Sequence, residues 1–375
     1  MKICIDTRVI QPGDTFIPVK GPNFDGRDFI PEAIQKGARL LDVDLAKFAK
    51  SYRKKLNCHV VGITGSAGKT TLKDMLHSVL SQSFQVVKTH QNQNNEIGVP
   101  LTVLSADADT DILLVEMAMR KKGDIDILTK IVRPTHVAIP SIGLSHIEFF
   151  SNQRAIATAK AEIFKTTLAW EKKSRSAFLN YDMPYYDQVQ KKAARAGYQI
   201  FPVQGEGDLD TTLNLCRMIC KQFGCTEEQV QAGVASYQGS DHRLSVSTNN
   251  DITLIDDTYN ANPDGVKYAL DYLRQFSGRK VIVLGDMLEL GSYAKQAHQS
   301  LIDPLIDAGP SCVFTYGDLC KDISSEHLPV YHFDDKATLL SQLKAELKAG
   351  DVVLVKGSRG MAMDSIVKEL HHDMG

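Results

Sequence analysis

The chain has 375 residues, of which 43% are hydrophobic and 23% charged, and its net charge is −2 at pH 7. This composition is ordinary for a folded protein of two or three domains, and it lacks the basic excess typical of nucleic-acid binding. No apolar run approaches the ~20 residues of a membrane span, and the charged N-terminus lacks the apolar core of a signal peptide, so we expect a cytoplasmic protein.

The first block, residues 1–56, is predicted to form a small α/β domain. Short strand-like pieces at 2–5 and 15–19 come before and after turn-forming residues, and the turn-rich segment GPNFDGRDF follows. An amphipathic stretch ends the block, and its apolar face carries Leu45, Phe48, Ala49, Tyr52 and Leu56.

The second block, residues 57–240, alternates apolar strand-like runs with helical patterns. Strands are expected at 59–64, 111–116, 136–140 and 177–180, and a helix at 153–168. A Gly-rich turn and a helix follow the first of these strands. This order predicts a central domain with a parallel sheet of the P-loop ATPase type.

The third block, residues 241–375, is again α/β. Its expected strands are 253–256, 280–285, 311–315 and 352–356, and its expected helices are 264–275, 293–306, 336–349 and 361–370. We predict a Rossmann-like C-terminal domain. Parallel sheets of this kind bind ligands at the carboxyl ends of their strands, and the polar residues described below follow such ends.

The cysteines do not form a recognisable framework. There are seven, an odd number, which does not indicate structural disulfides in a chain of this length. Cys216, Cys220 and Cys225 lie close together, but in an apolar helical pattern without a C-x-x-C motif. We interpret them as buried thiols rather than a metal site.

The segment TGSAGKTT, residues 64–71, has the context of a phosphate-binding loop because it joins a predicted strand to a predicted helix. Its glycines, Gly65 and Gly68, would let backbone N–H groups turn toward phosphate oxygens. Lys69 would neutralise the β- and γ-phosphates and Thr70 would bind Mg²⁺. The remaining expected contacts to ATP within the loop are Ser66, Ala67 and Thr71. Ile63 replaces the first glycine of the general motif, so only a shorter form is present.

Three features after the loop could contact ligands. The polar segment HQNQNNEIGVP contains Asn92, Asn94 and Asn95, which could form a binding loop or cap a helix. Glu116 ends the apolar strand DILLVE, where a carboxylate could hold Mg²⁺ directly or through water. His146 follows another strand and could ligate a second metal or orient a phosphate, although a lone histidine is usually structural.

The third block supplies candidates at two strand ends. Asp257, Asn260 and Asn262 lie in DDTYNANPDG, where they could bind a base or ribose or cap the next helix. Asp286 follows VIVLG and could bind a ribose hydroxyl or a reacting amine.

A third strand end in this block is cationic. Lys356, Ser358 and Arg359 lie in VKGSRG at the start of a predicted helix, which suits a carboxylate ligand.

The series of motifs resembles the Mur ligases. The shared segments, in order, are TGSAGKTT, NQNNEIGVP, VEMAMRKKGDI, SIGLSHIEFF, AIATAKAEIF, DDTYNANPDG, VLGDMLELG and VKGSRGM. Near the N-terminus, DTRVIQPGDTF and GPNFDGRDF resemble the uridine-nucleotide domain of that family. The likeness is greatest to the branch that adds D-alanyl-D-alanine.

The resemblance implies roles for the central domain. Lys69, Thr70 and Glu116 would handle ATP and a first Mg²⁺. Lys160, a residue that would otherwise be a solvated helical lysine, would be carbamylated by CO₂ and would support a second Mg²⁺ with His146.

It also implies roles elsewhere in the chain. Arg243 would reach the γ-phosphate, Asn260 and Asn262 would contact adenine, and Ser358 and Arg359 would bind the carboxylate of the dipeptide. The other expected substrate-side residues are Thr7, Arg8, Asn92, Asn94, Asn95, Asp257 and Lys356, and Asp286 is expected on the ATP side.

The implied reaction is an ATP-dependent amide ligation in peptidoglycan precursor synthesis. A carboxylate of UDP-N-acetylmuramoyl-tripeptide would form an acyl phosphate, which the amine of D-Ala-D-Ala would attack, with the C-terminal domain closing over ATP. We expect a monomer that uses ATP and two Mg²⁺ ions. The sequence does not identify the third residue of the acceptor peptide.

The chain departs from the family in three ways. Its first domain is short, Pro140-Ser141 replaces Thr-Asn, and Glu116-Met117-Ala118 replaces Glu-x-Gly. The short first domain favours an alternative, a related ligase that joins a different amine and acid. Two further alternatives are a non-catalytic nucleotide-binding protein and a simple ATPase or kinase.

Overall fold

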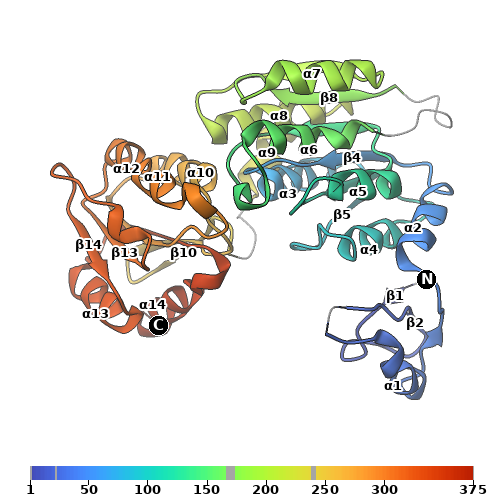
Figure 1. The fold of residues 1–375 in the computed structure, drawn as a ribbon, viewed down its shortest axis with the longest axis horizontal. Helices are drawn as coiled ribbons and strands as arrows, with labels where there is room; N and C mark the ends of the chain where they lie inside the picture. Colours follow the sequence, from blue (N-terminus) through green and yellow to red (C-terminus); the bar gives the residue numbers. More distant parts are fainter. Residues whose placement is uncertain (1, 22, 166–173, 238–241, 375) are drawn as a thin grey trace.

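The computed structural model describes residues 2–21, 23–165, 174–237 and 242–374. Figure 1 shows three bodies in chain order: a small N-terminal one in dark blue, a central one in blue to yellow-green, and a C-terminal one in yellow to red. Each is built around its own sheet. The predicted three-domain α/β fold is confirmed by this arrangement and by similar solved structures described below. The predicted boundary at 240 lies outside the described residues.

The N-terminal body has a small parallel sheet. Its strands, in the order β1-β2-β3, are β1 (Ile3–Cys4), β2 (Thr15–Phe16) and β3 (Arg39–Leu40). A 3₁₀ helix η1 (Gly26–Phe29) and α1 (Ile30–Gln35) lie between β2 and β3. The enclosed core consists of Cys4, Ile10, Phe16 and Ala33. We did not predict β3, because both of its side chains are exposed and the strand has no alternating pattern.

The central sheet is parallel throughout, as predicted. Its order is β5 (Val86–Lys88), β6 (Ile112–Glu116), β4 (His59–Ile63), β7 (His136–Ile139), β8 (Ser176–Asn180) and β9 (Gln199–Val203). Every residue of β6 is buried, which explains its continuous apolar run. The edge strands β5 and β9 were not predicted, because they are short or half-exposed.

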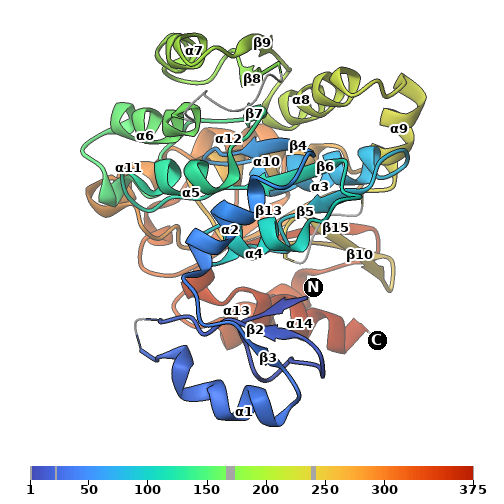
Figure 2. The same ribbon diagram turned by 90° about the vertical axis from the view of Figure 1, so that its right-hand side faces the viewer.

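Helices cover this sheet in two groups. One group contains α2 (Leu45–Arg53), α4 (Gly98–Ser105), α5 (Asp124–Val132), α6 (Gln153–Lys160) and α7 (Tyr186–Arg195), with the 3₁₀ helix η3 (Ala161–Phe164). The other contains α3 (Lys69–Leu80), α8 (Asp208–Gln222) and α9 (Glu227–Ala235). Figure 2 shows α5 and α6 on one side of this body and α8 and α9 on the other. The helix predicted at 153–168 is α-helical only to Lys160 and continues as η3, and 166–168 lie outside the described residues.

The C-terminal sheet is mixed. Its order is β10 (Ser245–Asn249), β11 (Ile252–Asp257), β15 (Asp351–Lys356), β12 (Arg279–Gly285), β13 (Cys312–Tyr316) and β14 (Val330–Phe333). Only the β10–β11 pair, among the described strands, is antiparallel. Asn250 and Asp251 join these two strands with φ of 47° and 59°, the conformation that a two-residue hairpin requires. We did not predict β10 or β14.

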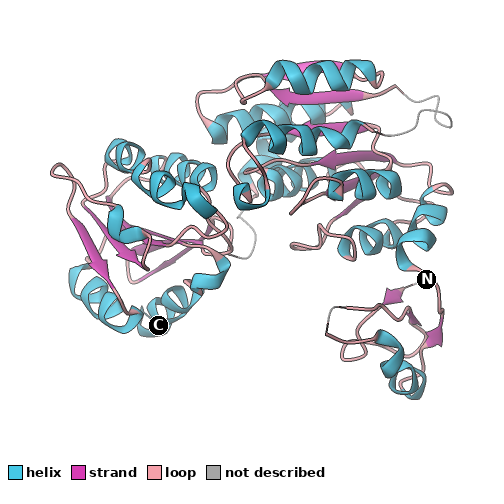
Figure 3. Ribbon diagram, viewed as in Figure 1, coloured by secondary structure: helices cyan, strands magenta, loops and turns pink. Residues whose placement is uncertain are grey.

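Helices cover both faces of this sheet as well. On one face lie α10 (Pro263–Arg274), α11 (Ala294–Gln299) and α12 (Ile302–Ala308), and on the other α13 (Lys336–Glu346) and α14 (Asp364–Met374), as Figures 1 and 3 show. Short 3₁₀ helices are η4 (Gly291–Tyr293), η5 (Cys320–Asp322) and η6 (Arg359–Met361). The single helix predicted at 293–306 is wrong. The chain turns at Ser300 and starts again as α12, where Pro304 lies in the first turn and removes no helical hydrogen bond.

Of the three cysteines predicted to be buried thiols, Cys216 and Cys220 are buried and Cys225 is partly exposed. The other four cysteines, which also lie in the described residues, are buried. In the described part of the chain, no helix combines the length and the apolar character needed to cross a bilayer.

Candidate active site

A cavity of about 930 Å³ lies between the central and C-terminal bodies. Its central wall comes from the start of α3, the end of β6 and the loops after β5 and β7. Its C-terminal wall comes from the loops after β11 and β15. These are the carboxyl ends of strands in two sheets that face each other, which is where parallel α/β sheets place their ligands.

The phosphate-binding loop is shaped by the loop that follows β7. Gly68 has a φ of 76°, which lets the backbone turn into α3. Ser141 brackets the loop, because its Oγ accepts the Ala67 N–H at 2.7 Å and its carbonyl accepts the Ser66 N–H at 3.1 Å. The Ser66 hydroxyl in turn accepts the Gly143 N–H at 2.8 Å. The replacement of Thr-Asn by Pro140-Ser141 thus leaves the loop well supported.

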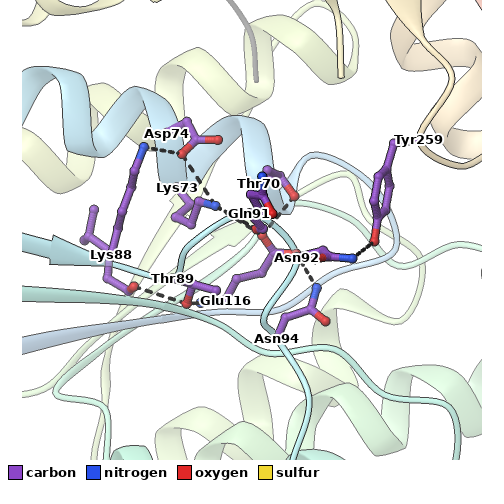
Figure 4. A network of polar contacts seen from close by, with 11 residues as sticks. Thr70, Lys73, Asp74, Lys88, Thr89, Gln91, Asn92, Asn94, Glu116 and Tyr259 are labelled. Atoms are coloured by element: carbon purple, nitrogen blue, oxygen red, sulfur yellow. Dashed lines mark hydrogen bonds and ion pairs between the residues drawn. The ribbon is translucent and has the colours of Figure 1, made fainter. Parts of the chain in front are cut away.

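Thr70 and Glu116 meet at the floor of the cavity (Figure 4). The Thr70 hydroxyl donates to Glu116 Oε2 at 2.8 Å, and the Asn94 amide donates to Oε1 at 2.8 Å. Glu116 is fully buried. The Lys73 ammonium lies 3.9 Å from Glu116 Oε2 and donates to the Gln91 carbonyl at 3.3 Å. A buried carboxylate and a hydroxyl form an all-oxygen donor set that suits Mg²⁺.

Two lysines in this region have weakened affinity for their protons. Lys69 folds back on its own loop and donates to the Gly65 carbonyl at 2.7 Å. Burial lowers the pKa of Lys69 to about 8, and the nearby charge of Arg243 also lowers it. Burial also lowers the pKa of Lys160 well below its usual range, and the charge of Lys69 lowers it further. Among the described residues, no carboxylate lies within ion-pair distance of the Lys160 ammonium, so its neutral amine is favoured.

His146 faces the cavity from the central wall and contacts the opposite wall. Its Nδ1 lies 2.6 Å from Glu289 Oε2, and both side chains line the cavity. Burial lowers the pKa of His146, and the charges of Lys160 and Lys69 lower it as well, whereas Glu289 opposes them. The imidazole is therefore favoured in its neutral form, which is the form that can ligate a metal.

The C-terminal wall holds its polar groups by mutual contacts. Lys356 forms a short ion pair with Asp257 and donates to the Asn260 carbonyl at 2.9 Å. Burial raises the pKa of Asp257, and Lys356 opposes that rise. The Ser358 hydroxyl accepts the Leu288 N–H at 2.8 Å. Arg359 is mostly exposed, so of this group it has the most freedom to meet a ligand.

Tyr259 joins the two walls and carries Arg243 on its ring. The Arg243 guanidinium lies 3.9 Å from the centre of the Tyr259 ring, a stacked cation–π contact. The Tyr259 hydroxyl accepts a short hydrogen bond from the Asn92 amide of the central wall (Figure 4).

Most of the predicted site residues converge on this cavity. The lining includes Ser66, Ala67, Gly68, Lys69, Thr70, Thr71, Asn92, Asn94, Asn95, Glu116, His146, Arg243, Asp257, Asn260, Asn262, Lys356, Ser358 and Arg359. Two of them also cap helices: Asn95 Oδ1 accepts the Gly98 N–H at 3.0 Å, and Asn262 Oδ1 accepts the Gly265 N–H at 2.9 Å. The helix-capping interpretation is therefore confirmed for these two asparagines, and their contact with a ligand stays a prediction.

Five predicted residues lie outside the lining. Gly65 and Lys160 lie just behind it, next to Lys69. The Asp286 carboxylate is buried and accepts the Cys320 N–H at 2.8 Å, so it shapes the loop after β13. In the N-terminal body the Thr7 hydroxyl donates to Glu32 at 3.0 Å, and Arg8 pairs with Asp6. A contact of these last three with ligand stays a prediction.

A second cavity, of about 680 Å³, lies between the N-terminal and central bodies. Its lining includes Lys2, Asp6, Lys88, His90 and Gln93, together with apolar side chains from β1 and α4. Thr7 and Arg8 are close in sequence to this lining but are not part of it.

Sequence reasoning missed four supporting residues. Lys73 carried a signal, since a lysine on the buried face of a helix is unusual, and Ser141 lies in a segment where the chain departs from the family pattern. Glu289 and Asp264 had no recognisable sequence signal, because their contacts are with residues of the other domain. Asp264 Oδ2 accepts the Leu144 N–H of the central body at 3.2 Å, a contact between residues 120 positions apart.

Comparisons with known proteins agree with this geometry. The family model for the Mur ligase catalytic domain matches residues 2–92, the model for the Mur ligase middle domain matches 63–211, and the model for the Mur ligase glutamate ligase domain matches 242–359. The chain is 31% identical to the UDP-N-acetylmuramoyl-tripeptide–D-alanyl-D-alanine ligase of Bacillus subtilis, covering 98% of this chain and 92% of that protein. The enzyme of that name from Escherichia coli is 28% identical, with 99% and 94% covered.

Solved structures are similar over nearly the whole chain. MurF from Acinetobacter baumannii superposes with a TM-score of 0.85 at 25% identity, covering 98% of this chain and 93% of that one. MurF ligase from Thermotoga maritima in complex with ADP superposes with a TM-score of 0.83 at 27% identity, covering 100% and 97%.

Proposed function

The chain belongs to the Mur ligase family, and we propose that it joins D-alanyl-D-alanine to UDP-N-acetylmuramoyl-tripeptide while ATP is converted to ADP and phosphate. We further propose that the reaction takes place in the cytoplasm and that the enzyme acts as a monomer.

One observation carries the proposal. A single cavity holds a phosphate-binding loop with Lys69 on one wall and the cations Arg243, Lys356 and Arg359 on the other. A ligase that makes an acyl phosphate needs both, because the nucleotide is anionic and each of the other two substrates presents a carboxylate. The relatives that match over nearly the full chain carry the name of this reaction.

In the first step the carboxylate of the tripeptide attacks the γ-phosphate. A bond forms between a carboxylate oxygen and the γ-phosphorus, and the bond from that phosphorus to ADP breaks. Lys69 and Arg243 line the cavity from opposite walls, so both would balance the charge that moves during transfer. A bound triphosphate would draw Lys69 away from the Gly65 carbonyl and raise its pKa.

The donor groups on the central wall fit divalent metal ions. Thr70 and Glu116 would hold one Mg²⁺ through oxygen, and His146 with Lys160 would hold a second. When bound, such ions stabilise charge on the transferring phosphoryl group.

Lys160 fits the second metal position only after modification. Its neutral amine can attack CO₂, which forms an N–C bond and releases one proton to solvent, so that the neutral amine becomes a carbamate anion. The low pKa that burial imposes on Lys160 favours this reaction, because only the neutral amine is a nucleophile.

In the second step the amine of the dipeptide attacks the acyl phosphate. An amide bond forms, the bond to phosphate breaks, and phosphate takes up the proton that the amine loses. Ser358 and Arg359 lie at the start of η6, where they would orient the dipeptide carboxylate. The contacts between the two walls would exclude water from the acyl phosphate.

The test is phosphate release from ATP and Mg²⁺, measured with the tripeptide nucleotide and the dipeptide together and singly. We expect release only when both are present, with the pentapeptide product identified by mass. A Lys69→Met variant, expected to lose about 10²–10³-fold in kcat, controls for contaminating ATPase.

The substrate pair is the part of the proposal that this assay can overturn. The alignment with the Bacillus subtilis enzyme spans 425 positions, so that enzyme has residues that this chain of 375 lacks. If ATP binds but no product forms from this pair, the activity is that of a ligase for a different acid and amine.

A further inference from the structure

One hydrogen bond crosses the large cavity at the place where a metal ion is proposed. His146, between β7 and the 3₁₀ helix η2 (Ile147–Phe149), meets Glu289, in the loop between β12 and η4. The distance from Nδ1 to Oε2 is 2.6 Å. Both residues have left-handed backbone conformations, with φ of 62° and 60°. Left-handed conformations in residues other than glycine are unfavourable and concentrate at functional sites.

The surrounding backbone holds the pair in register. Gly291 packs on Glu148 so closely that an added Cβ would lie 3.1 Å from the Glu148 Cβ. The side chain of Glu289 is only 36% exposed, and it lines the cavity together with His146. The contact is therefore not an accidental surface ion pair, since its two partners are fixed by close packing beside the proposed metal position.

The chemistry of the pair determines which ring nitrogen carries the proton. A carboxylate only accepts hydrogen bonds, so the neutral imidazole must keep its proton on Nδ1. Nε2 then carries the lone pair, and it has no hydrogen-bond partner among the residues that the structure describes. A histidine that binds a metal through one nitrogen usually donates its other N–H to a carboxylate or carbonyl in this way.

We propose that Glu289 is a positioning residue, which fixes His146 in the tautomer that offers Nε2 to a divalent metal ion and does so from the opposite domain. This inference rests on the proposed function, in which His146 binds the second metal. It adds that the metal site is complete only when the C-terminal domain contacts the central domain. Metal binding and domain closure then reinforce each other, because each stabilises the same arrangement.

The first measurement is the tautomer of His146, which requires no turnover. Nitrogen-15 spectra of histidine-labelled protein distinguish the two neutral forms, and a His146→Gln variant assigns the signal among the eleven histidines. We expect a proton on Nδ1 in the unmodified protein and a shift toward the Nε2-protonated form in Glu289→Ala. A wild-type signal from the Nε2-protonated form would overturn the proposal.

The second measurement is metal affinity in the presence of ADP, followed by the electron spin resonance of Mn²⁺, which accepts imidazole ligands more readily than Mg²⁺ does. Loss of such an outer partner typically weakens metal binding about 10–100-fold, and we expect a loss of this size in Glu289→Ala. Glu289→Gln keeps an acceptor oxygen for Nδ1–H and should recover most of the affinity. If Glu289 had only a structural role, Glu289→Ala and Glu289→Gln would bind Mn²⁺ with the same affinity.

Asp271→Ala is the matched control for Glu289→Ala. Asp271 also joins the domains, because its Oδ2 accepts the Asp208 N–H of α8 at 3.3 Å, but it does not line the cavity. We expect unchanged Mn²⁺ affinity in this variant. Equal losses in Asp271→Ala and Glu289→Ala would show that any loosening of the interface has this effect, and would overturn the specific role. Failure of the ligase assay alone would count against the proposed function, while the tautomer and Mn²⁺ results would still decide the role of Glu289.

Discussion

The two walls of the large cavity are built in different ways. The central wall takes Thr70 and Glu116 from regular elements, because Thr70 lies in the first turn of α3 and Glu116 is the last residue of β6. The C-terminal wall takes Arg243, Glu289 and Ser358 from loops, and two of its connections to the central wall are single hydrogen bonds. The central wall is thus prepared for a nucleotide by the fold itself. The C-terminal wall contributes only when the two domains are in contact.

The variant Lys160→Ala tests whether the central wall carries the chemistry, and we expect the largest effect there. If a carbamate on Lys160 supports the metal, kcat should fall by about 10²–10³-fold and added bicarbonate should not restore it. The variant should fold normally, because it removes a buried amine that has no carboxylate partner among the described residues. The measurement is phosphate release with both substrates. Full activity in Lys160→Ala would exclude a role for the carbamate.

Arg243→Ala tests the C-terminal wall. We expect kcat to fall by about 10–10²-fold while ADP affinity changes little, because Arg243 is proposed to act on the γ-phosphate that ADP lacks. Steady-state rates together with ADP titration calorimetry separate these two effects. Arg243→Lys keeps the charge and should retain part of the rate, although it weakens stacking on Tyr259. An equal loss of ADP affinity and rate would place Arg243 at the other phosphates.

Tyr259→Phe removes one connection between the walls and keeps the ring on which Arg243 stacks. The loss of the hydrogen bond from Asn92 should cost about 1 kcal/mol, or roughly fivefold in kcat/KM. Combining it with Asn92→Ala in a double-mutant cycle isolates the pair. If the single and double variants lose activity additively, the bond does not join the walls in solution.

Asp208→Asn should have the smallest effect, and it acts on stability. Burial beside Asp264 and Asp271 raises the pKa of Asp208 to about 6 from a usual 3.8, so the folded state binds this proton more tightly than the unfolded state. The resulting stabilisation is present below pH 3.8 and is lost as the pH rises through 6. We therefore expect the variant to be more stable than wild type at pH 7.5, by on the order of 1 kcal/mol, with no gain at pH 4.

Urea unfolding at the two pH values measures this difference. Glu206→Gln, at an exposed carboxylate two residues before Asp208, is the control for loss of charge alone. A gain for Asp208→Asn at pH 4 as large as at pH 7.5 would show that Asp208 does not titrate as described.

The fold was predictable where the burial of an element gives its sequence a clear apolar pattern. Strands β6 and β15 are buried at every position, and both were recognised as continuous apolar runs. Strands β3 and β10 were missed, because their side chains are exposed or alternate weakly and their position is decided by pairing with distant strands. The break between α11 and α12 was missed because a proline in the first turn of a helix is compatible with a helical pattern.

The site residues divide in the same way, into those that local sequence predicts and those that depend on distant contacts. Lys69 and Glu116 could be predicted because a strand end fixes their position locally. Lys356 and Ser358 were placed in the same cavity by the resemblance of their motif. The contacts His146–Glu289 and Leu144–Asp264 could not be predicted, because they join residues more than a hundred positions apart and depend on how two domains pack.

The distribution of the cysteines allows the unfolding of each body to be followed separately. Cys225 is the partly exposed cysteine, so a thiol-reactive dye should label the native protein at one position, and slowly, since burial raises the pKa of this thiol to about 11. Cys4 is enclosed in the N-terminal body, Cys216 in the central one and Cys312 in the C-terminal one. Peptide mapping of the dye over time would therefore report the order in which the three bodies open, without any engineered probe.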